Sequence, residues 1–152
     1  MLLEFSGRFK LGLLADGAVA CQQAKVNALL LGPFMQAIVY SDEIDGVRSR
    51  RPDPRPYREI LKQLGSTPAN AMFVGDNPLK DFLRAKALGW VTARVLTGEY
   101  ADVTYPSPEH AAAYDISSVA RLPALFCGEV RPYEINMQSN TEPLGSVTTT
   151  QH

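Results

Sequence analysis

Cysteine is scarce in this chain. Only Cys21 and Cys127 occur among 152 residues, far apart and without the spacing of a metal site or a disulfide framework. We expect two free thiols in a reducing, cytoplasmic setting, with a structural disulfide as the alternative. The first ten residues, MLLEFSGRFK, lack the basic region and the long apolar region of a secretory signal, which agrees with that setting.

Long hydrophobic runs and an excess of one charge are lacking too. No apolar run approaches the roughly 20 residues that cross a bilayer. Acidic and basic residues are mixed along the chain and leave a net charge of −1. Without a basic stripe or a polybasic amphipathic helix, we expect no nucleic-acid partner and no membrane partner. With 45% hydrophobic and 20% charged residues, the composition instead fits a globular domain.

What the sequence does have is a regular alternation of apolar and amphipathic segments. Strands are predicted at 10–14, 37–40, 71–74 and 90–95, with a short fifth strand at 114–116. Helices are predicted at 21–31, 54–64 and 78–88, with a short helix within 117–126. This alternation predicts an α/β fold, a three-layer Rossmann-like parallel sheet with helices on both faces.

Each of the three longer predicted helices carries an apolar side. It consists of Val26, Leu29 and Leu30 in the first helix, Tyr57, Ile60, Leu61 and Leu64 in the second, and Leu79, Phe82 and Leu83 in the third. We expect the α/β domain to extend over residues 1–127. Residues 128–152 are polar and show no periodicity, which predicts a poorly ordered tail.

Polar residues follow the predicted strands. They are Asp16 after the first strand, Ser41, Asp42 and Glu43 after the second, Asp76 after the third, and Thr97 and Gly98 after the fourth. In parallel sheets of this kind, ligands bind at the carboxyl ends of the strands. We therefore expect the functional site among these residues.

The segment FVGDNPLKDF, residues 73–82, places two aspartates at a strand-to-helix turn. Mg²⁺ prefers one or two carboxylates, several waters and a substrate phosphate. We expect Asp76 to be the metal ligand, and Asp81 to bind the metal through water or to brace the loop. Asn77 completes the metal site and caps a helix that starts at Pro78, whose N-terminus would favour a phosphate. In the alternative, Asp76 only supports the turn and Asp81 only complements the helix dipole.

The order of several segments resembles the catalytic domain of the haloacid dehalogenase (HAD) superfamily, whose members are hydrolases and mostly phosphatases. FVGDNPLKDF is similar to its fourth, Mg²⁺-binding motif, and LGLLADG (11–17) is similar to its second motif. RRPDPRPYREILKQLG (50–65) is similar to the region around its third motif. The resemblance covers residues 9–100.

This resemblance implies Mg²⁺-dependent hydrolysis of a small phosphorylated substrate through an aspartyl phosphate. Ala15 stands where the second motif has Ser or Thr for the phosphoryl group, so Asp16 or the N–H of Gly17 would substitute. Arg51, or alternatively Arg50, stands where the third motif has the Lys that stabilises charge on the nucleophile and the phosphate. Arg51 and Asp16 are thus the expected catalytic residues, and Arg51 binds phosphate together with residues 15–17. The alternative for both arginines is a solvated loop pair.

The first motif of the family, Asp-x-Asp on the first strand, is absent from the sequence. In the family, its first Asp attacks phosphorus and its second Asp is the general acid and base. SDEID (41–45) has the wrong spacing and follows the wrong strand. LLADGAVA (13–20) has Leu14 where the nucleophile belongs, and its downstream spacing fits the second motif better. No nucleophile stands at a matching position, and the simplest account is that the chain is the C-terminal part of a longer enzyme.

The missing strand would lie between the strands that carry motifs two and four. Without it, the strands at 10–14 and 71–74 have unpaired edges, and each buried unpaired backbone group costs roughly 1–3 kcal/mol. Residues 2–5 are one candidate to fill the gap, although they look more like the end of a helix. Direct pairing of the two strands is another. A missing N-terminal segment or a second chain is the third.

Two functions stay open on these grounds. The first is a HAD-like phosphohydrolase for which the chain supplies motifs two to four. The second is a non-catalytic HAD-like module that binds a phosphorylated ligand or a protein partner, which Ala15 and the missing nucleophile favour. A phosphoacceptor receiver domain is disfavoured, because it needs an acidic pair after its first strand and the sequence has only Asp16 there.

Overall fold

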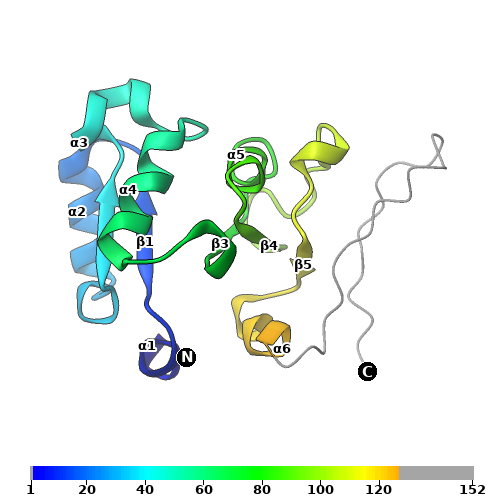
Figure 1. The fold of residues 1–152 in the computed structure, drawn as a ribbon, viewed down its shortest axis with the longest axis horizontal. Helices are drawn as coiled ribbons and strands as arrows, with labels where there is room; N and C mark the ends of the chain where they lie inside the picture. The colour runs from blue at the N-terminus through cyan, green and yellow to red at the C-terminus, as the bar shows by residue number, and fades with distance from the viewer. Residues whose placement is uncertain (1, 127–152) are drawn as a thin grey trace. The chain divides into compact units, whose positions relative to one another are not determined.

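Residues 2–126 are described by the structure, a computed structural model (Figure 1). The chain divides into two units, Met1–Ala71 and Met72–His152, and each is described by itself. The predicted polar tail at 128–152 lies outside the described residues, and the single domain over 1–127 stays a prediction. None of the helices within residues 2–126 combines the length and the hydropathy that a membrane crossing requires.

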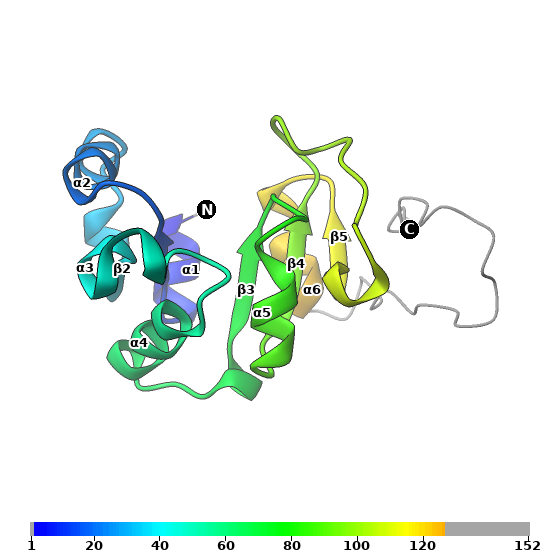
Figure 2. The same cartoon turned by 90° about the horizontal axis from the view of Figure 1, so that it is seen from above.

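The first unit is built on two parallel strands. Its elements are α1 (Leu2–Arg8), β1 (Gly12–Ala15), α2 (Val19–Ala28), β2 (Ala37–Tyr40), α3 (Asp42–Asp45) and α4 (Pro54–Leu64), with 3₁₀ turns η1 (Gly32–Phe34), η2 (Gly46–Ser49) and η3 (Pro68–Asn70). β1 pairs with β2 in a register that runs from Gly12 opposite Ala37 to Ala15 opposite Tyr40. α4 packs against both strands, and α2 lies on their other side (Figure 2).

Helix α4 forms where its local sequence signals place it. The side chain of Asp53 accepts a hydrogen bond from the backbone N–H of Arg55, 2.9 Å away, and caps the helix, which Pro54 then begins. Gly65 ends the helix in the left-handed conformation, with a φ of 58°. Tyr57, Ile60 and Leu61 are buried, as predicted. Both the span and the buried side of this helix are confirmed.

The second unit is a three-stranded parallel sheet. Its elements are β3 (Met72–Gly75), α5 (Phe82–Ala87), β4 (Val91–Val95), β5 (Tyr114–Ile116) and α6 (Leu122–Phe126), with 3₁₀ turns η4 (Pro108–His110) and η5 (Val119–Arg121). β4 is the central strand and pairs in parallel with β3 and with β5. It is buried from Thr92 to Val95, and α5 packs against β3 and β4. The predicted α/β fold with parallel strands is confirmed.

Helix α2 ends earlier than predicted. The sequence placed its end at Leu31, whereas the structure ends it at Ala28. The N–H of Leu31 turns back to the carbonyl of Val26, and Leu30 adopts a left-handed φ of 52°. Because the chain leaves the helix there, Leu29 and Leu30 do not belong to its apolar side as predicted and are 67% and 73% exposed. Val26 is buried as expected.

Helix α5 begins later than predicted, at Phe82 instead of Pro78. Asn77 does not cap it, because its side chain accepts a hydrogen bond from the N–H of Leu79 inside the preceding turn. The helix buries Phe82, as predicted, whereas Leu79 and Leu83 are 55% and 38% exposed, so their predicted burial is wrong. With only six residues, α5 does not supply the phosphate-binding helix N-terminus that the sequence suggested.

Each sheet has one unpaired strand edge. From the sequence, an additional strand is expected to pair there. β1 is hydrogen-bonded to β2 and β3 to β4, and no strand within residues 2–126 pairs with the other edge of β1 or of β3. Residues 2–5 do not fill that position, because they lie in helix α1. Of the two expectations for this segment, the end of a helix is therefore the correct one.

Candidate functional site

The carboxyl ends of β1 and β2 bring together Asp16, Ser41 and Arg51. The hydroxyl of Ser41 donates to Asp16 Oδ1 at 2.6 Å, and Arg51 donates to Asp16 Oδ2 through its Nε at 3.0 Å and its backbone N–H at 3.2 Å. The side chains of Arg51 and Asp16 are only 13% and 8% exposed. The two residues that were predicted to be catalytic thus lie together and form an ion pair.

These contacts control the charge of Asp16. Burial alone would raise the pKa of the Asp16 carboxyl, but the hydrogen bond from Ser41 and the guanidinium of Arg51 outweigh it, so the pKa lies below its ordinary value. Asp16 is therefore a carboxylate at neutral pH. A carboxylate that already accepts three hydrogen bonds is a poor substitute for the hydroxyl that the second motif lacks at Ala15.

A second ion pair lies in the same unit. Arg50 binds Asp42 with two parallel hydrogen bonds, from Nε at 2.7 Å and from Nη2 at 2.8 Å. These hydrogen bonds are the largest cause of the lowered pKa of Asp42, and a hydrogen bond from the backbone of Gly17 adds to it. We call Asp16, Asp42, Arg50 and Arg51 the arginine-paired cluster.

Ser49 connects the chain segments that carry this cluster, and the sequence did not predict that role. Its side chain is fully buried; its hydroxyl donates to the carbonyl of Ser41 and accepts the backbone N–H of Asp45. Ser49 thereby ties the segment after β2 to the residues that precede the two arginines. One serine in a polar loop gives no sequence signal for such a role, because its partners are fixed only by the folded chain.

The turn after β3 is held in a different way. One oxygen of Asp81, Oδ2, accepts the backbone N–H groups of Asp76 at 3.1 Å and of Asn77 at 2.9 Å. Asp81 is 2% exposed, whereas Asp76 is exposed to solvent. Of the two roles that the sequence left open for Asp81, these hydrogen bonds match the bracing of the loop. We call Asp76, Asn77 and Asp81 the aspartate turn.

Gly75 makes the close approach of Asp81 feasible. A Cβ atom at Gly75 would lie 2.5 Å from Oδ2 of Asp81 and 3.0 Å from its Cβ. Any side chain at position 75 would therefore push Asp81 away from the two N–H groups that it binds. The side chain of Asp81, which closes the turn, thus explains the glycine of the FVGDNPLKDF segment. This role of Gly75 was not predicted from the sequence.

The aspartate turn has the donor chemistry that Mg²⁺ requires. Its side chains offer only oxygen and amide groups, with the Asp76 carboxylate facing solvent at the end of β3. Within residues 2–126 no three His, Cys, Asp or Glu side chains come together as a metal-binding group. Mg²⁺ keeps most of its waters and needs only one or two carboxylates, so the turn fits this ion and does not fit a metal that needs a full protein cage.

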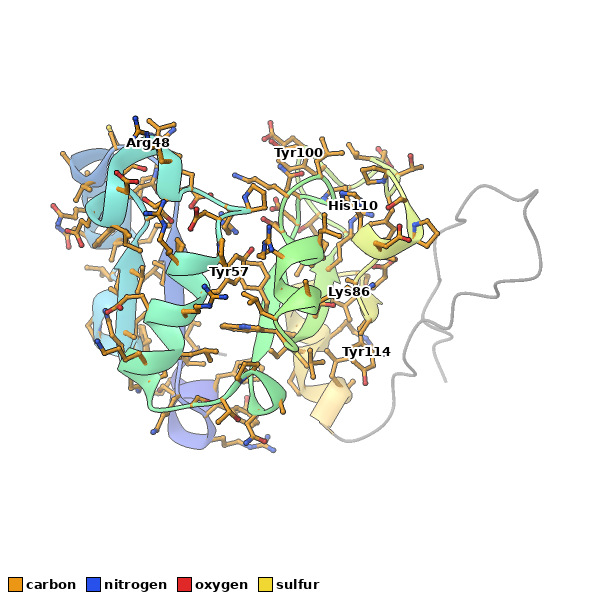
Figure 3. All side chains as sticks on the ribbon, turned by 45° about the horizontal axis from the view of Figure 1, so that its top comes forward. Arg48, Tyr57, Lys86, Tyr100, His110 and Tyr114 are labelled. Carbon is orange, nitrogen blue, oxygen red and sulfur yellow. The ribbon has the colours of Figure 1, made fainter. Side chains whose placement is uncertain are left out.

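The loop after β4 borders the aspartate turn. Gly98 has a left-handed φ of 80°, and a Cβ atom there would lie 4.0 Å from Oδ2 of Asp76. A hydrogen bond with Glu99 is the largest cause of the raised pKa of Tyr100, and the charges of Asp76 and Asp81 contribute to it. Tyr100 lies at the opposite end of the second unit from Tyr114, which begins β5 (Figure 3). The predicted gathering of Gly98 with Asp76 is confirmed.

The chain is similar to known proteins of one family. A family model described as HAD-hydrolase-like matches residues 49–122. The glyceraldehyde 3-phosphate phosphatase of Methanopyrus kandleri is 37% identical over 95 residues, which make up 62% of this chain and 40% of the relative. The protein of the same name from Methanocaldococcus jannaschii is 31% identical over 113 residues, 74% of this chain and 47% of the relative.

Among solved structures, the HAD-hydrolase YfnB from Bacillus subtilis, bound to magnesium, aligns with a TM-score of 0.70 and 17% identity. The alignment covers 82% of this chain and 52% of YfnB. The chain belongs to the haloacid dehalogenase superfamily of hydrolases, which confirms the resemblance read from its motifs. It spans less than half the length of the two phosphatases that it matches.

Proposed function

We propose that this chain supplies the metal- and phosphate-binding part of a Mg²⁺-dependent phosphohydrolase that acts on a small phosphorylated molecule. The observation that carries this proposal is the aspartate turn, in which an exposed carboxylate follows a parallel strand and a buried carboxylate braces the backbone behind it. The similar proteins named above are phosphatases and one similar structure holds magnesium, which supports the reaction class and the ion.

Each residue has a role in this proposal. Asp76 would bind Mg²⁺ directly, and Asp81 would hold the turn and contact the ion through water. When bound, Mg²⁺ neutralises negative charge on the phosphoryl group during its transfer. Arg51, which the family resemblance implies as a phosphate ligand, would bind a phosphate oxygen, and Asp16 orients its guanidinium by accepting its Nε–H. Asn77 keeps the turn closed through its hydrogen bond to the N–H of Leu79.

The nucleophile must come from outside the 152 residues, because no Asp-x-Asp occurs in them. We propose that a missing N-terminal segment or a second chain adds an apolar strand with this motif to the open edge of β1 or of β3. Its first carboxylate would form a bond to phosphorus while the ester oxygen leaves with a proton from the second carboxyl group. Water would then attack the phosphorus and give a proton to the second carboxylate, while the bond between phosphorus and the first carboxylate breaks, which frees that carboxylate and inorganic phosphate.

A second candidate function is a non-catalytic module that binds a phosphorylated ligand or a protein partner. Two observations favour it: Ala15 offers no hydroxyl, and the guanidiniums of Arg50 and Arg51 are already paired with carboxylates. Such a module would bind the ion or the ligand and would not turn substrate over, even with the missing strand supplied.

We also propose a reducing compartment, the cytoplasm. Cys21 is exposed and forms no disulfide with any residue in the described part of the chain, which is compatible with that setting. Cys127 lies outside the described residues.

The first experiment measures ion binding by the whole chain. Mn²⁺, a paramagnetic substitute for Mg²⁺, is titrated and the free ion is followed by electron paramagnetic resonance. We expect Asp76→Asn to abolish binding and Asp42→Asn, a matched change in the arginine-paired cluster, to leave the dissociation constant unchanged. Equal binding by wild type and Asp76→Asn would sink the assignment of the metal site.

The second experiment separates the two functions. A strand peptide with Asp-x-Asp, or a fusion of such a strand to the N-terminus, is combined with the chain, and phosphate release from glyceraldehyde 3-phosphate and other small phosphate monoesters is measured. The phosphohydrolase predicts release that Asp76→Asn abolishes. Ion binding without phosphate release from any ester, with the strand in place, would favour the non-catalytic module.

A further inference from the structure

Arg94 is a charged residue in the centre of an apolar strand. It lies in β4, whose neighbouring positions are Thr92, Ala93 and Val95, and it is only 3% exposed. Charged groups avoid such positions unless partners replace the water that they lose. In the sequence, the arginine within WVTARV is the one sign of this role, and that segment was predicted only as a strand.

The partners of Arg94 are backbone carbonyls of the loop after β4. Its Nη2 donates to the carbonyl of Tyr100 at 2.8 Å and to that of Val103 at 2.5 Å. The guanidinium carbon also lies 4.7 Å from the centre of the Tyr105 ring, within the range of a cation–π contact. The Arg94 side chain therefore contacts the loop between β4 and β5 at three residues, Tyr100, Val103 and Tyr105.

The hydrogen bonds of Arg94 compensate its burial only in part. The Nε–H of Arg94 is buried and has no hydrogen-bond partner within residues 2–126, so part of its desolvation cost remains. Its charge also acts on the buried Asp115 carboxyl in β5, where it opposes the rise in pKa that burial causes. What an apolar residue would not provide is the pair of hydrogen bonds to the loop carbonyls.

The fastened loop is the one that borders the aspartate turn. A Cβ atom at Gly98 would lie 4.0 Å from Oδ2 of Asp76, and Gly98 comes two residues before Tyr100, whose carbonyl Arg94 binds. A further contact links the end of this loop to the residue after the aspartate turn. The ring of Tyr105 packs edge-to-face on the ring of Phe82, with 6.3 Å between ring centres. Phe82 is the first residue of α5 and follows Asp81 directly. Both ends of the loop are thus positioned against the turn.

We propose that Arg94 is a positioning residue, which holds the loop from Gly98 to Val103 beside the Asp76 carboxylate and thereby sets the affinity of the aspartate turn for its divalent cation. The inference rests on the proposed function, because it assumes that Asp76 binds the ion. Arg94 itself does not touch the ion. It acts through the two carbonyls that it binds, as residues behind a metal ligand do when they fix the geometry of the site.

The test uses the whole chain, Mn²⁺ binding and three variants. Arg94→Met keeps an unbranched side chain of similar reach and removes the donors. Thr92→Val is the matched control: Thr92 is buried in the same strand and its hydroxyl accepts the backbone N–H of Ala113, which lies outside the loop from Gly98 to Val103. Asp76→Asn reports whether the ion binds at the aspartate turn at all. The melting temperature of the second unit is followed by the fluorescence of Trp90, the single tryptophan.

We expect Arg94→Met to raise the Mn²⁺ dissociation constant about tenfold, at the lower end of what residues behind a metal ligand contribute. Amide hydrogen exchange should become faster from Gly98 to Val103. Thr92→Val should lower the melting temperature, because the N–H of Ala113 loses its partner, and should leave both the dissociation constant and the exchange of these amides unchanged. That contrast separates positioning from a merely structural role.

Three results would overturn the inference. An unchanged dissociation constant in folded Arg94→Met, with binding abolished by Asp76→Asn, refutes the role of Arg94 and leaves the proposed function standing. An absence of Mn²⁺ binding by the wild-type chain refutes the proposed function and this inference together. If Arg94→Met does not fold, Arg94→Lys decides: it keeps the charge and loses the forked geometry, so wild-type affinity and wild-type loop exchange in that variant refute the inference.

Discussion

The two units hold their carboxylates with different groups. In the arginine-paired cluster, Asp16 and Asp42 each face a guanidinium. In the aspartate turn, Asp81 is held by backbone N–H groups, and Asp76 forms no ion pair with any residue in the described part of the chain. The first arrangement cancels negative charge, whereas in the second the charge of Asp76 stays available to a cation from solution.

This difference shows that an aspartate at the end of a parallel strand has no fixed function. Its neighbours decide whether the carboxylate is structural or is a ligand. A paired guanidinium competes with a metal ion for the same oxygen lone pairs, whereas a backbone N–H orients a carboxylate without cancelling its full charge. Four changes test whether the two units differ in this way.

The largest effect is expected from Arg51→Met. Removing one partner of a buried ion pair leaves Asp16 charged and out of water, and we expect a loss of about 3 kcal/mol in the unfolding free energy of the first unit. Amide hydrogen exchange of β1 and β2 measures it. The double variant Arg51→Met/Asp16→Asn should recover most of the loss, because no unpaired charge is left; a double variant as unstable as the single one would contradict the ion-pair explanation.

Gly75→Ala should have the next largest effect. Its Cβ would meet Oδ2 of Asp81, so the aspartate turn must open or distort, at a cost of about 2 kcal/mol. Chemical unfolding followed by Trp90 fluorescence measures this loss, and Mn²⁺ binding should weaken in parallel. Gly7→Ala is the control, since nothing lies within 4 Å of its new Cβ and α1 should gain stability. Equal effects of the two substitutions would remove the reason given for Gly75.

Acid should affect the two units in opposite directions through their buried carboxyls. The lowered pKa of Asp16 and of Asp42 stabilises the first unit above about pH 4, the ordinary value for an aspartate, and this stabilisation is lost as the pH falls through the folded-state values. Burial is the largest cause of the raised pKa of Asp115, which the hydrogen bond from Tyr105 and the charge of Arg94 only partly oppose. Its contribution to stability is present at low pH and is lost as the pH rises through the folded-state value.

Residue-resolved hydrogen exchange between pH 6 and pH 3 would measure this contrast. Amides of β1 and β2 should lose protection as the pH falls. Asp115→Asn should stabilise the second unit at neutral pH, and the gain over wild type should shrink toward low pH, where Asp115 is protonated. A gain that grows as the pH falls would show that the sign of the Asp115 contribution is wrong.

The smallest effect is expected from Arg50→Gln. The Arg50 side chain is 37% exposed, and solvent screens its pair with Asp42 far more than it screens the buried pair of Arg51. The change in melting temperature should be the smallest of the four and should vanish in about 1 M salt, where exposed charges are screened within a few ångströms. A loss as large as that of Arg51→Met would show that the two arginines are not as different as their burial indicates.

Local signals predicted much of the fold. Helix α4 and strands β2 and β5 have the predicted bounds, because Asp53, Pro54 and Gly65 mark the ends of the helix and short apolar runs mark the strands. The start of α5 was wrong, because side chains of Asn77 and Asp81 bind backbone N–H groups and hold a turn where helical periodicity had already begun. Periodicity reports which side chains are apolar and cannot report which polar side chain binds the backbone.

The candidate site was predictable to a similar degree. The aspartate turn lies within ten residues, so its motif named Asp76 and Asp81 correctly as neighbours. The pairing of Asp16 with Arg51 joins residues 35 positions apart, and only the folded first unit shows that each cancels the charge of the other. Arg94 binds carbonyls of the backbone, which have no side-chain identity, so no residue pattern could name its partners.

The bracing of the turn by Asp81 has a consequence for how an ion would arrive. Because the backbone of Asp76 and Asn77 is already fixed by hydrogen bonds, binding need not order the loop, and the site is preorganised. The heat capacity of the chain should then change little on binding, since no apolar surface is buried and no segment folds. The rate of capture would be set by how fast the ion sheds its own water, a property of the metal and not of the protein.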